Sequence, residues 1–110
     1  MNKQCDIIRT WKGWTLIKNA TTYEDMLIND VFPSVKKKGV HGLKKVNIAT
    51  KTVGNEVEFF LTLQFDSIEA VKLFAGENYQ KAYIPDNAKK ILSRYDKVAE
   101  HYYLKEEINL

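Results

Sequence analysis

Few side chains of this sequence could take part directly in chemistry, and His101 and Arg9 are the strongest candidates. An imidazole has an unperturbed pKa of about 6.5, so it can accept a proton near neutral pH. A guanidinium stays charged and can hold an anion through its N–H donors. The pair therefore suits proton abstraction and anion binding in an apolar chamber. Aromatic side chains that could wall such a chamber are Trp11, Trp14, Phe60, Tyr79 and Tyr83.

The same residues also have structural interpretations, which the sequence leaves open. His101 could occupy a solvated strand position, and Arg9 could pair with a carboxylate at the edge of a dimer. Tyr79 and Tyr83 are four residues apart, so they either form a lid over a pocket or seal the core. The run Lys36–Lys38 is typical of a solvated helix end, where cations face the negative pole.

Several common kinds of site lack their residues in this sequence. The two histidines, His41 and His101, and the single Cys5 do not have the ligand spacing of a zinc site. The five glycines are dispersed, so there is no glycine-rich phosphate loop. No serine lies in the context of a nucleophile elbow. We therefore expect no metal and no cofactor.

Length and composition predict one globular domain over residues 1–110. The chain has 45% hydrophobic and 28% charged residues, which is ordinary for a globular protein. A net charge of +3 is too small for the basic face of a nucleic-acid-binding protein. There is no signal-peptide pattern and no apolar run of the ~20 residues that span a bilayer. We expect a soluble, cytoplasmic protein that binds neither nucleic acid nor membrane.

Four segments rich in β-branched and aromatic residues predict strands. Gly54–Asn55 suits a tight hairpin turn between the second and third of them. Alternation in the third places Glu58 and Phe60 on one face and a fully apolar set on the other. The predicted strands cover residues 6–16, 43–53, 56–65 and 97–104.

The first predicted helix begins near Thr21, because Thr21 and Glu24 have the spacing of a capping box. Pro33 removes a hydrogen bond within it and predicts a kink or break. Gly39 after a lysine run predicts its end. Its apolar stripe consists of Tyr23, Leu27, Val31 and Val35.

A second helix follows the third strand directly. Asp66 with Glu69 predicts its cap, and Gly76 predicts its end. After Pro85 a short helical piece is expected over residues 86–95. The second helix buries Ile68, Val71, Phe74 and Ala75.

The order strand, helix, strand, strand, helix, strand predicts a ferredoxin-like βαββαβ sandwich of the α+β class, with both helices on one face of a four-stranded antiparallel sheet. Trp11 and Trp14 are three residues apart, so a regular strand places them on opposite faces. The face away from the helices carries Phe60, and the last strand has aromatic residues on both sides, Tyr102 on one and His101 with Tyr103 on the other. A sheet face that mixes such groups with polar ones is too apolar to remain in water. We expect an identical subunit to cover it, which makes the protein a homodimer.

Four pieces of the chain, in order, carry a resemblance to a known family. They are Ile8–Thr15 (IRTWKGWT), Glu58–Glu77 (EFFLTLQFDSIEAVKLFAGE), Tyr79–Pro85 (YQKAYIP) and Val98–Tyr103 (VAEHYY). Together they span most of the chain and resemble the antibiotic-biosynthesis monooxygenase family of dimeric α+β barrels. The resemblance implies two sheets packed face to face across a two-fold axis, with a cavity on the sheet face in each subunit.

Members of this family include cofactor-independent oxygenases that act on electron-rich polycyclic phenols, and others without an established activity. The resemblance implies a base to ionise the phenol and a cation to hold the phenolate, roles for which His101 and Arg9 are the candidates. The haem-degrading branch of the fold needs a histidine beyond the second helix. The stretch Tyr79–Pro85 contains none, so we expect no haem binding.

Three functional hypotheses follow. The protein is a cofactor-independent monooxygenase for a small aromatic or phenolic substrate, a non-catalytic barrel that binds such a molecule, or a structural dimer with a filled barrel. The cavity discriminates between them: side chains such as Trp11 and Phe60 that fill it favour the third, and an open cavity with His101 in its wall favours the first.

Overall fold

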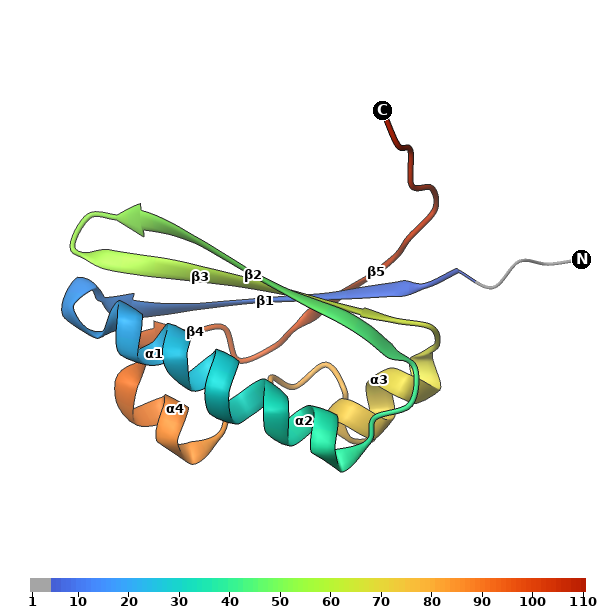
Figure 1. Ribbon diagram of the computed structural model, residues 1–110, viewed down its shortest axis with the longest axis horizontal. Coiled ribbons are helices and arrows are strands. Elements are labelled where there is room, and N and C mark those ends of the chain that lie inside the picture. Colours follow the sequence, from blue (N-terminus) through green and yellow to red (C-terminus); the bar gives the residue numbers. More distant parts are fainter. Residues whose placement is uncertain (1–4) are drawn as a thin grey trace, which may run out of the picture.

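An antiparallel sheet carries all the helices on one face (Figure 1). The computed structural model describes residues 5–110. The strand order is β2-β3-β1, and the two short strands β4 and β5 both pair with the far edge of β1. This arrangement confirms the predicted α+β ferredoxin-like fold. The strands are β1 (Ile7–Leu16), β2 (Leu43–Val53), β3 (Glu56–Phe65), β4 (Arg94–Tyr95) and β5 (Glu100–Tyr103).

The helical layer consists of one long helical segment and two short helices. The long segment begins with a 3₁₀ turn (η1, Ile17–Asn19) and continues as α1 (Ala20–Met26), a π turn (η2, Leu27–Val31) and α2 (Phe32–Lys38). The short helices are α3 (Ile68–Ala75) and α4 (Asp86–Ile91).

The predicted irregularity in the first helix lies immediately before Pro33. The η2 segment is a π turn, in which a backbone N–H donates to the carbonyl five residues earlier: the Phe32 N–H donates to the Leu27 carbonyl. Pro33 then falls in the first turn of α2, where a missing N–H is tolerated. The helix ends as predicted at Gly39, which has a left-handed φ of 74°.

Neither of the two predicted capping residues, Thr21 and Asp66, caps its helix. The 3₁₀ turn starts the first helix early, so Thr21 lies inside α1 and makes no cap, and Asn19 precedes the helix. At α3 the cap is Ser67 rather than Asp66: the Ser67 hydroxyl accepts a hydrogen bond from the Ala70 N–H at 3.2 Å. A serine satisfies this amide as well as an aspartate does, so spacing alone could not choose between neighbours.

The predicted last strand, 97–104, is shorter than expected. Only Glu100–Tyr103 joins the sheet as β5, and Val98 forms an isolated bridge with Lys81. Residues 97–99 hydrogen-bond to the loop of residues 80–82 and not to β1: the Ala82 N–H donates to the Lys97 carbonyl at 2.9 Å, and the Ala99 N–H donates to the Gln80 carbonyl at 2.7 Å. Just before this segment, the Trp11 indole N–H donates to the Asp96 carbonyl at 2.7 Å.

The core lies between the sheet and the helices. The first strand alternates as predicted, with Ile7 and Trp11 buried on the helix side. The predicted stripe of the first helix and the inward set of β3 meet here: Tyr23, Leu27, Val31, Val35, Phe59, Leu61, Leu63 and Phe65 are all buried.

One buried polar atom in this core has no hydrogen-bond partner among the described residues. It is the hydroxyl oxygen of Thr15, a fully buried residue of β1. Replacing Thr15 by valine keeps the shape and removes the unpaired hydroxyl. We expect Thr15→Val to raise the free energy of unfolding by about 1 kcal/mol, as measured by urea denaturation. Thr62→Val, on the other sheet face, is the matched control with no expected gain; a loss of stability in Thr15→Val would contradict the prediction.

Candidate functional site

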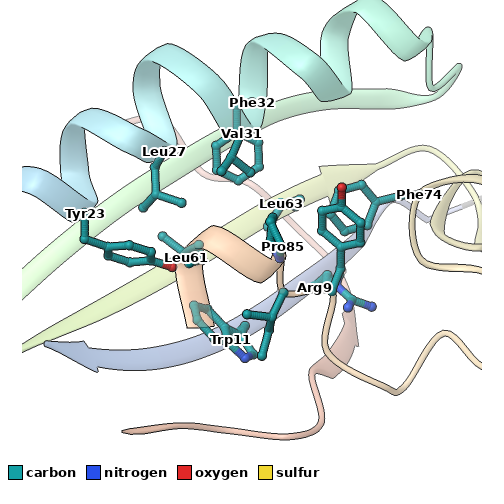
Figure 2. A pocket seen from close by; sticks show the side chains of 13 residues that line it. Arg9, Trp11, Tyr23, Leu27, Val31, Phe32, Leu61, Leu63, Phe74 and Pro85 are labelled. Carbon is teal, nitrogen blue, oxygen red and sulfur yellow. The ribbon is translucent and has the colours of Figure 1, made fainter. Parts of the chain in front are cut away.

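A cavity of about 40 Å³ lies between the sheet and the helical layer. Its wall is apolar apart from the side chains of Arg9 and two tyrosines. The apolar side chains come from the long helix, from β3 and from the segment that leads into α4, and Figure 2 shows them converging. A buried water needs roughly 10–15 Å³, so the space holds two or three waters and no aromatic ring.

Arg9 supplies the positive charge of this wall. Its side chain lies on the helix face of β1 and is only 2% exposed. The guanidinium donates to the backbone carbonyls of Tyr79 and Lys81, the latter at 3.1 Å, and lies 5.4 Å from the centre of the Phe74 ring. Arg9 therefore ties β1 to the loop between α3 and α4.

The charge of Arg9 has no counter-ion in the described part of the chain. None of the ion pairs among residues 5–110 includes it. Burial lowers the pKa of Arg9 to about 10, so the guanidinium is charged at neutral pH. A buried cation whose partners are neutral retains the capacity to attract an anion.

His101 faces Arg9 across the β1–β5 pair. Its Nε2 atom lies 3.1 Å from Arg9 Nη1. A guanidinium only donates, so Nε2 accepts this bond and the ring proton resides on Nδ1. Burial, and then the neighbouring charge of Arg9, lower the pKa of His101 to about 4. His101 is therefore neutral at pH 7, and its lone pair holds Arg9.

The structure brings five of the predicted site residues together. Arg9, Trp11 and Tyr83 line the cavity. His101 contacts Arg9 from outside the cavity wall, and the Tyr79 ring packs edge-on against His101 with centroids 5.2 Å apart. The two tyrosines have different roles: Tyr79 contacts Arg9 through its carbonyl and His101 through its ring, and Tyr83 covers the cavity.

Trp11 is held in place by its neighbours on both sides. A side chain on Gly13 would collide with the Trp11 ring, so the glycine allows the indole to lie flat along the strand. The hydrogen bond to the Asp96 carbonyl fixes the other edge of the ring. Trp11 therefore occupies much of the space that an open chamber would need.

Trp14 and Phe60 lie on the opposite face of the sheet and do not reach this cavity. The Trp14 indole N–H donates to Glu58 at 3.2 Å, and the Arg94 guanidinium stacks on the ring at 4.0 Å. Phe60 packs near the Lys12 ammonium, which is 5.8 Å from the ring centre. They were predicted to line the same chamber as Trp11. The alternation of side chains along β1 and β3 places them on the other face of the sheet.

Tyr23 is a cavity residue that the sequence did not single out. Its spacing placed it in an apolar stripe, and the ring does pack edge-on against Phe59 at 4.8 Å. Its hydroxyl, however, points toward the cavity, as Figure 2 shows. Burial raises the pKa of Tyr23, so the hydroxyl stays protonated and can donate. Periodicity reports that a residue is buried, not where its polar end points.

The pKa of His101 predicts a specific pH dependence of stability. Between about pH 6.5 and pH 4 the unfolded chain takes up a proton on this imidazole that the folded chain does not. The free energy of unfolding should therefore fall as the pH falls through this window, by roughly 1–2 kcal/mol after allowance for solvent screening.

Urea denaturation at pH 7 and pH 4.5 measures this effect in the parent and in His101→Gln. Glutamine can still accept a hydrogen bond from Arg9 but does not titrate. The variant should lose less stability on acidification than the parent. An equal loss in both proteins would assign the pH dependence to the carboxylates.

The comparisons with known proteins bear on the fold. The structure is similar to a crystal structure from Bacillus cereus that is described as a putative antibiotic biosynthesis monooxygenase. The TM-score is 0.67, the sequence identity is 14%, and the match covers 96% of this chain and 99% of that chain. No protein-family model and no curated protein matches the sequence. At this identity the likeness establishes the fold and leaves the activity open.

Neither a membrane-spanning helix nor a metal-binding cluster is present among residues 5–110. No helix within residues 5–110 is long and apolar enough to cross a membrane. No three His, Cys, Asp or Glu side chains in that range gather in a way that could hold a metal ion.

Proposed function

We propose that the protein is a cofactor-independent monooxygenase that acts on a small aromatic or phenolic substrate held beside Arg9. The observation that carries the proposal is a buried guanidinium that has no counter-ion among residues 5–110, in a wall that is otherwise almost entirely apolar. Such a site suits a flat apolar molecule with one anionic oxygen. The fold shared with the Bacillus cereus protein, whose description names a monooxygenase, agrees with this chemistry.

In the proposed reaction Arg9 stabilises the phenolate form of the substrate. A cation in a dry site favours ionisation of a bound phenol much more strongly than it would in water. The electron-rich phenolate can then transfer one electron to dioxygen, and the substrate radical and superoxide combine at a ring carbon that carries a hydrogen to form a peroxide. Loss of that hydrogen as a proton and cleavage of the O–O bond release water and leave a quinone, so one oxygen atom enters the product and the substrate supplies all the electrons. The hydroxyl of Tyr23 lies in the same wall and would donate a hydrogen bond to an oxygen atom of the substrate or of dioxygen.

His101 has two proposed roles, which follow one another. In the structure its Nε2 atom accepts a hydrogen bond from Arg9, so His101 positions the guanidinium and its lone pair is not available to take a proton. An anion that draws Arg9 toward the cavity would free this lone pair. His101 could then accept the phenol proton, which makes base function conditional on substrate binding.

Entry of a substrate requires side chains to move. The present space of about 40 Å³ is well below the ~150 Å³ of a cavity that holds benzene. Tyr83 is 47% exposed and packs against Phe74 at the cavity mouth. Rotation of Tyr83 outward is the smallest change that opens the wall to solvent.

The proposed assembly is a homodimer in which the sheet faces that carry Phe60 pack together. Two hollows of 310 and 360 Å³ flank Phe60 on this face. Apolar groups beside them include Val98, which is 58% exposed, and Tyr102, which is 52% exposed. Burial of these groups against a second copy would remove them from water.

The function is tested by oxygen uptake with a panel of dihydroxynaphthalene and anthrone-like phenols, with the parent, His101→Ala and Arg9→Ala. Uptake that needs no added metal, flavin or nicotinamide and is lost in both variants would support the monooxygenase. Uptake that survives in both would place the chemistry elsewhere.

A non-catalytic binding protein is the second candidate, because the buried Arg9 guanidinium could hold an anion without turnover. The small cavity, much of whose space Trp11 occupies, favours the third hypothesis, a structural dimer with a filled barrel. Calorimetric titration with the same phenols separates the monooxygenase from the binding protein. Tight binding that depends on Arg9 without oxygen uptake would establish the binding protein. If the protein shows no binding and no oxygen uptake, the structural dimer is the remaining hypothesis.

A further inference from the structure

Charge is unevenly distributed along this chain. Residues 31–55 contain six lysines and no aspartate or glutamate, although the whole chain has a net charge of only +3. The remainder of the chain therefore carries a net charge of −3. The basic segment folds as α2, the following turn and β2, which places its lysines at one edge of the molecule.

An apolar groove of 380 Å³ lies within this basic region. Its floor consists of partly or fully buried apolar side chains between α2 and the start of β2, including Val35, Val40 and Leu43. Lys36 and Lys45 stand at its rim, and neither takes part in an ion pair within residues 5–110. The groove thus combines an apolar floor with free positive charge.

The chain after β5 has the complementary character. Leu104 is anchored by its N–H to the Asp6 carbonyl at 2.8 Å, and residues 105–110 then run without secondary structure. Figure 1 shows this tail leaving the body on the side of the sheet away from the helices. Glu106 and Glu107 form no ion pair with the described residues, and the two apolar side chains that follow, Ile108 and Leu110, are exposed.

We propose that the tail of residues 105–110 docks into the groove beside α2 of a second copy of this chain. The glutamates would pair with Lys36 and Lys45. Ile108 and Leu110 are two residues apart, so an extended tail points both side chains to one side, toward the apolar floor. The groove exceeds the ~150 Å³ that accommodates benzene, so it has room for aliphatic side chains.

A second copy fits this surface better than other occupants do. No arginine lines the groove, and the only rings in its lining are the partly buried ring of Phe32 and the imidazole of His41, so the groove lacks the bidentate contacts that favour nucleic acid. In a two-fold dimer each tail would meet the other subunit's groove, so the contact occurs twice and is self-complementary. The tail also points toward the face that the sheet dimer would occupy.

The test measures the dimer dissociation constant by sedimentation of the full chain at low ionic strength, where exposed charge pairs contribute most. The tail variant is Glu106→Lys with Glu107→Lys, and the groove variant is Lys36→Glu with Lys45→Glu. We expect each to weaken dimerisation tenfold or more, because every reversal acts at two symmetric contacts. The combined fourfold variant should recover to within about threefold of the parent.

The matched control is Lys37→Glu with Lys38→Glu, which also reverses two lysines, both at the end of α2 next to Lys36 but outside the groove. It should leave the dissociation constant within threefold of the parent. Equal weakening by control and groove variants, no recovery in the combined variant, or a parent that stays monomeric would each overturn the proposal. If both reversal variants stay dimeric and Phe60→Asp dissociates the dimer, the tail contact is contradicted and the sheet-face dimer is retained.

Discussion

Replacing Arg9 by methionine should lower the affinity for an anionic phenol, and any turnover of it, by about 10²–10³-fold. Methionine keeps an unbranched apolar side chain in the cavity wall and removes the charge. The buried guanidinium has no carboxylate partner among residues 5–110, so its field acts on whatever enters the cavity. Removing it leaves nothing in the wall that could offset a negative charge.

Three comparisons make this result specific. Arg9→Lys retains a charge but loses the planar fork that reaches both loop carbonyls, so it should be intermediate. Arg94→Met removes an arginine on the other sheet face and should leave affinity unchanged. A neutral ligand of the same shape should lose far less affinity than the phenolate in Arg9→Met.

Folding must be measured in the same samples, because Arg9 also has a structural role. Its removal leaves the carbonyls of Tyr79 and Lys81 and the His101 nitrogen without their donor. Each buried group left unpaired costs about 1–3 kcal/mol, although the loss of a buried charge offsets part of this. An Arg9→Met protein that is folded and still binds the phenolate with parental affinity would contradict the anion site.

The positions of Arg9 and His101 illustrate what the sequence could predict. Both lie in segments whose alternation predicted strands, and the βαββαβ order placed those strands in one sheet. The 3.1 Å contact between them follows from the register of β1 against β5, which no local pattern specifies. Burial, and then the contact with Arg9, lower the pKa of His101. Neither can be inferred from residue type alone, which predicts a base with an ordinary pKa.

The sequence proposed more aromatic residues as cavity walls than lie around the one cavity. Trp11 and Trp14 were expected on opposite faces from their spacing, and the structure places them so. The same rule separates Trp11 from Phe60, whose partner across β1 is Lys12. The loop that carries Tyr79 and Tyr83 has no periodic pattern, and its conformation depends on hydrogen bonds to a side chain seventy residues earlier. The positions of Tyr79 and Tyr83 therefore follow from contacts between distant parts of the chain and not from local sequence.

Phe60→Asp should convert the proposed dimer into a folded monomer. Phe60 sits in the central strand β3 on the face away from the helices, so in a monomer an aspartate at this position is solvated and harmless. In a dimer it would be buried near the two-fold axis together with its symmetric copy. An unpaired buried carboxylate costs several kcal/mol, and the second carboxylate adds repulsion.

Lys12 lies close enough to reduce this cost, because its ammonium is 5.8 Å from the Phe60 ring. Phe60→Lys removes that compensation by bringing like charges together, so it should dissociate the dimer at least as completely as Phe60→Asp. Leu73→Asp is the control, since Leu73 is 56% exposed on α3, in the helical layer, and should not affect assembly. Sedimentation at micromolar concentration decides the matter: a parent that is monomeric, or Phe60 variants that remain dimeric with native circular dichroism, would show that this face is not the interface.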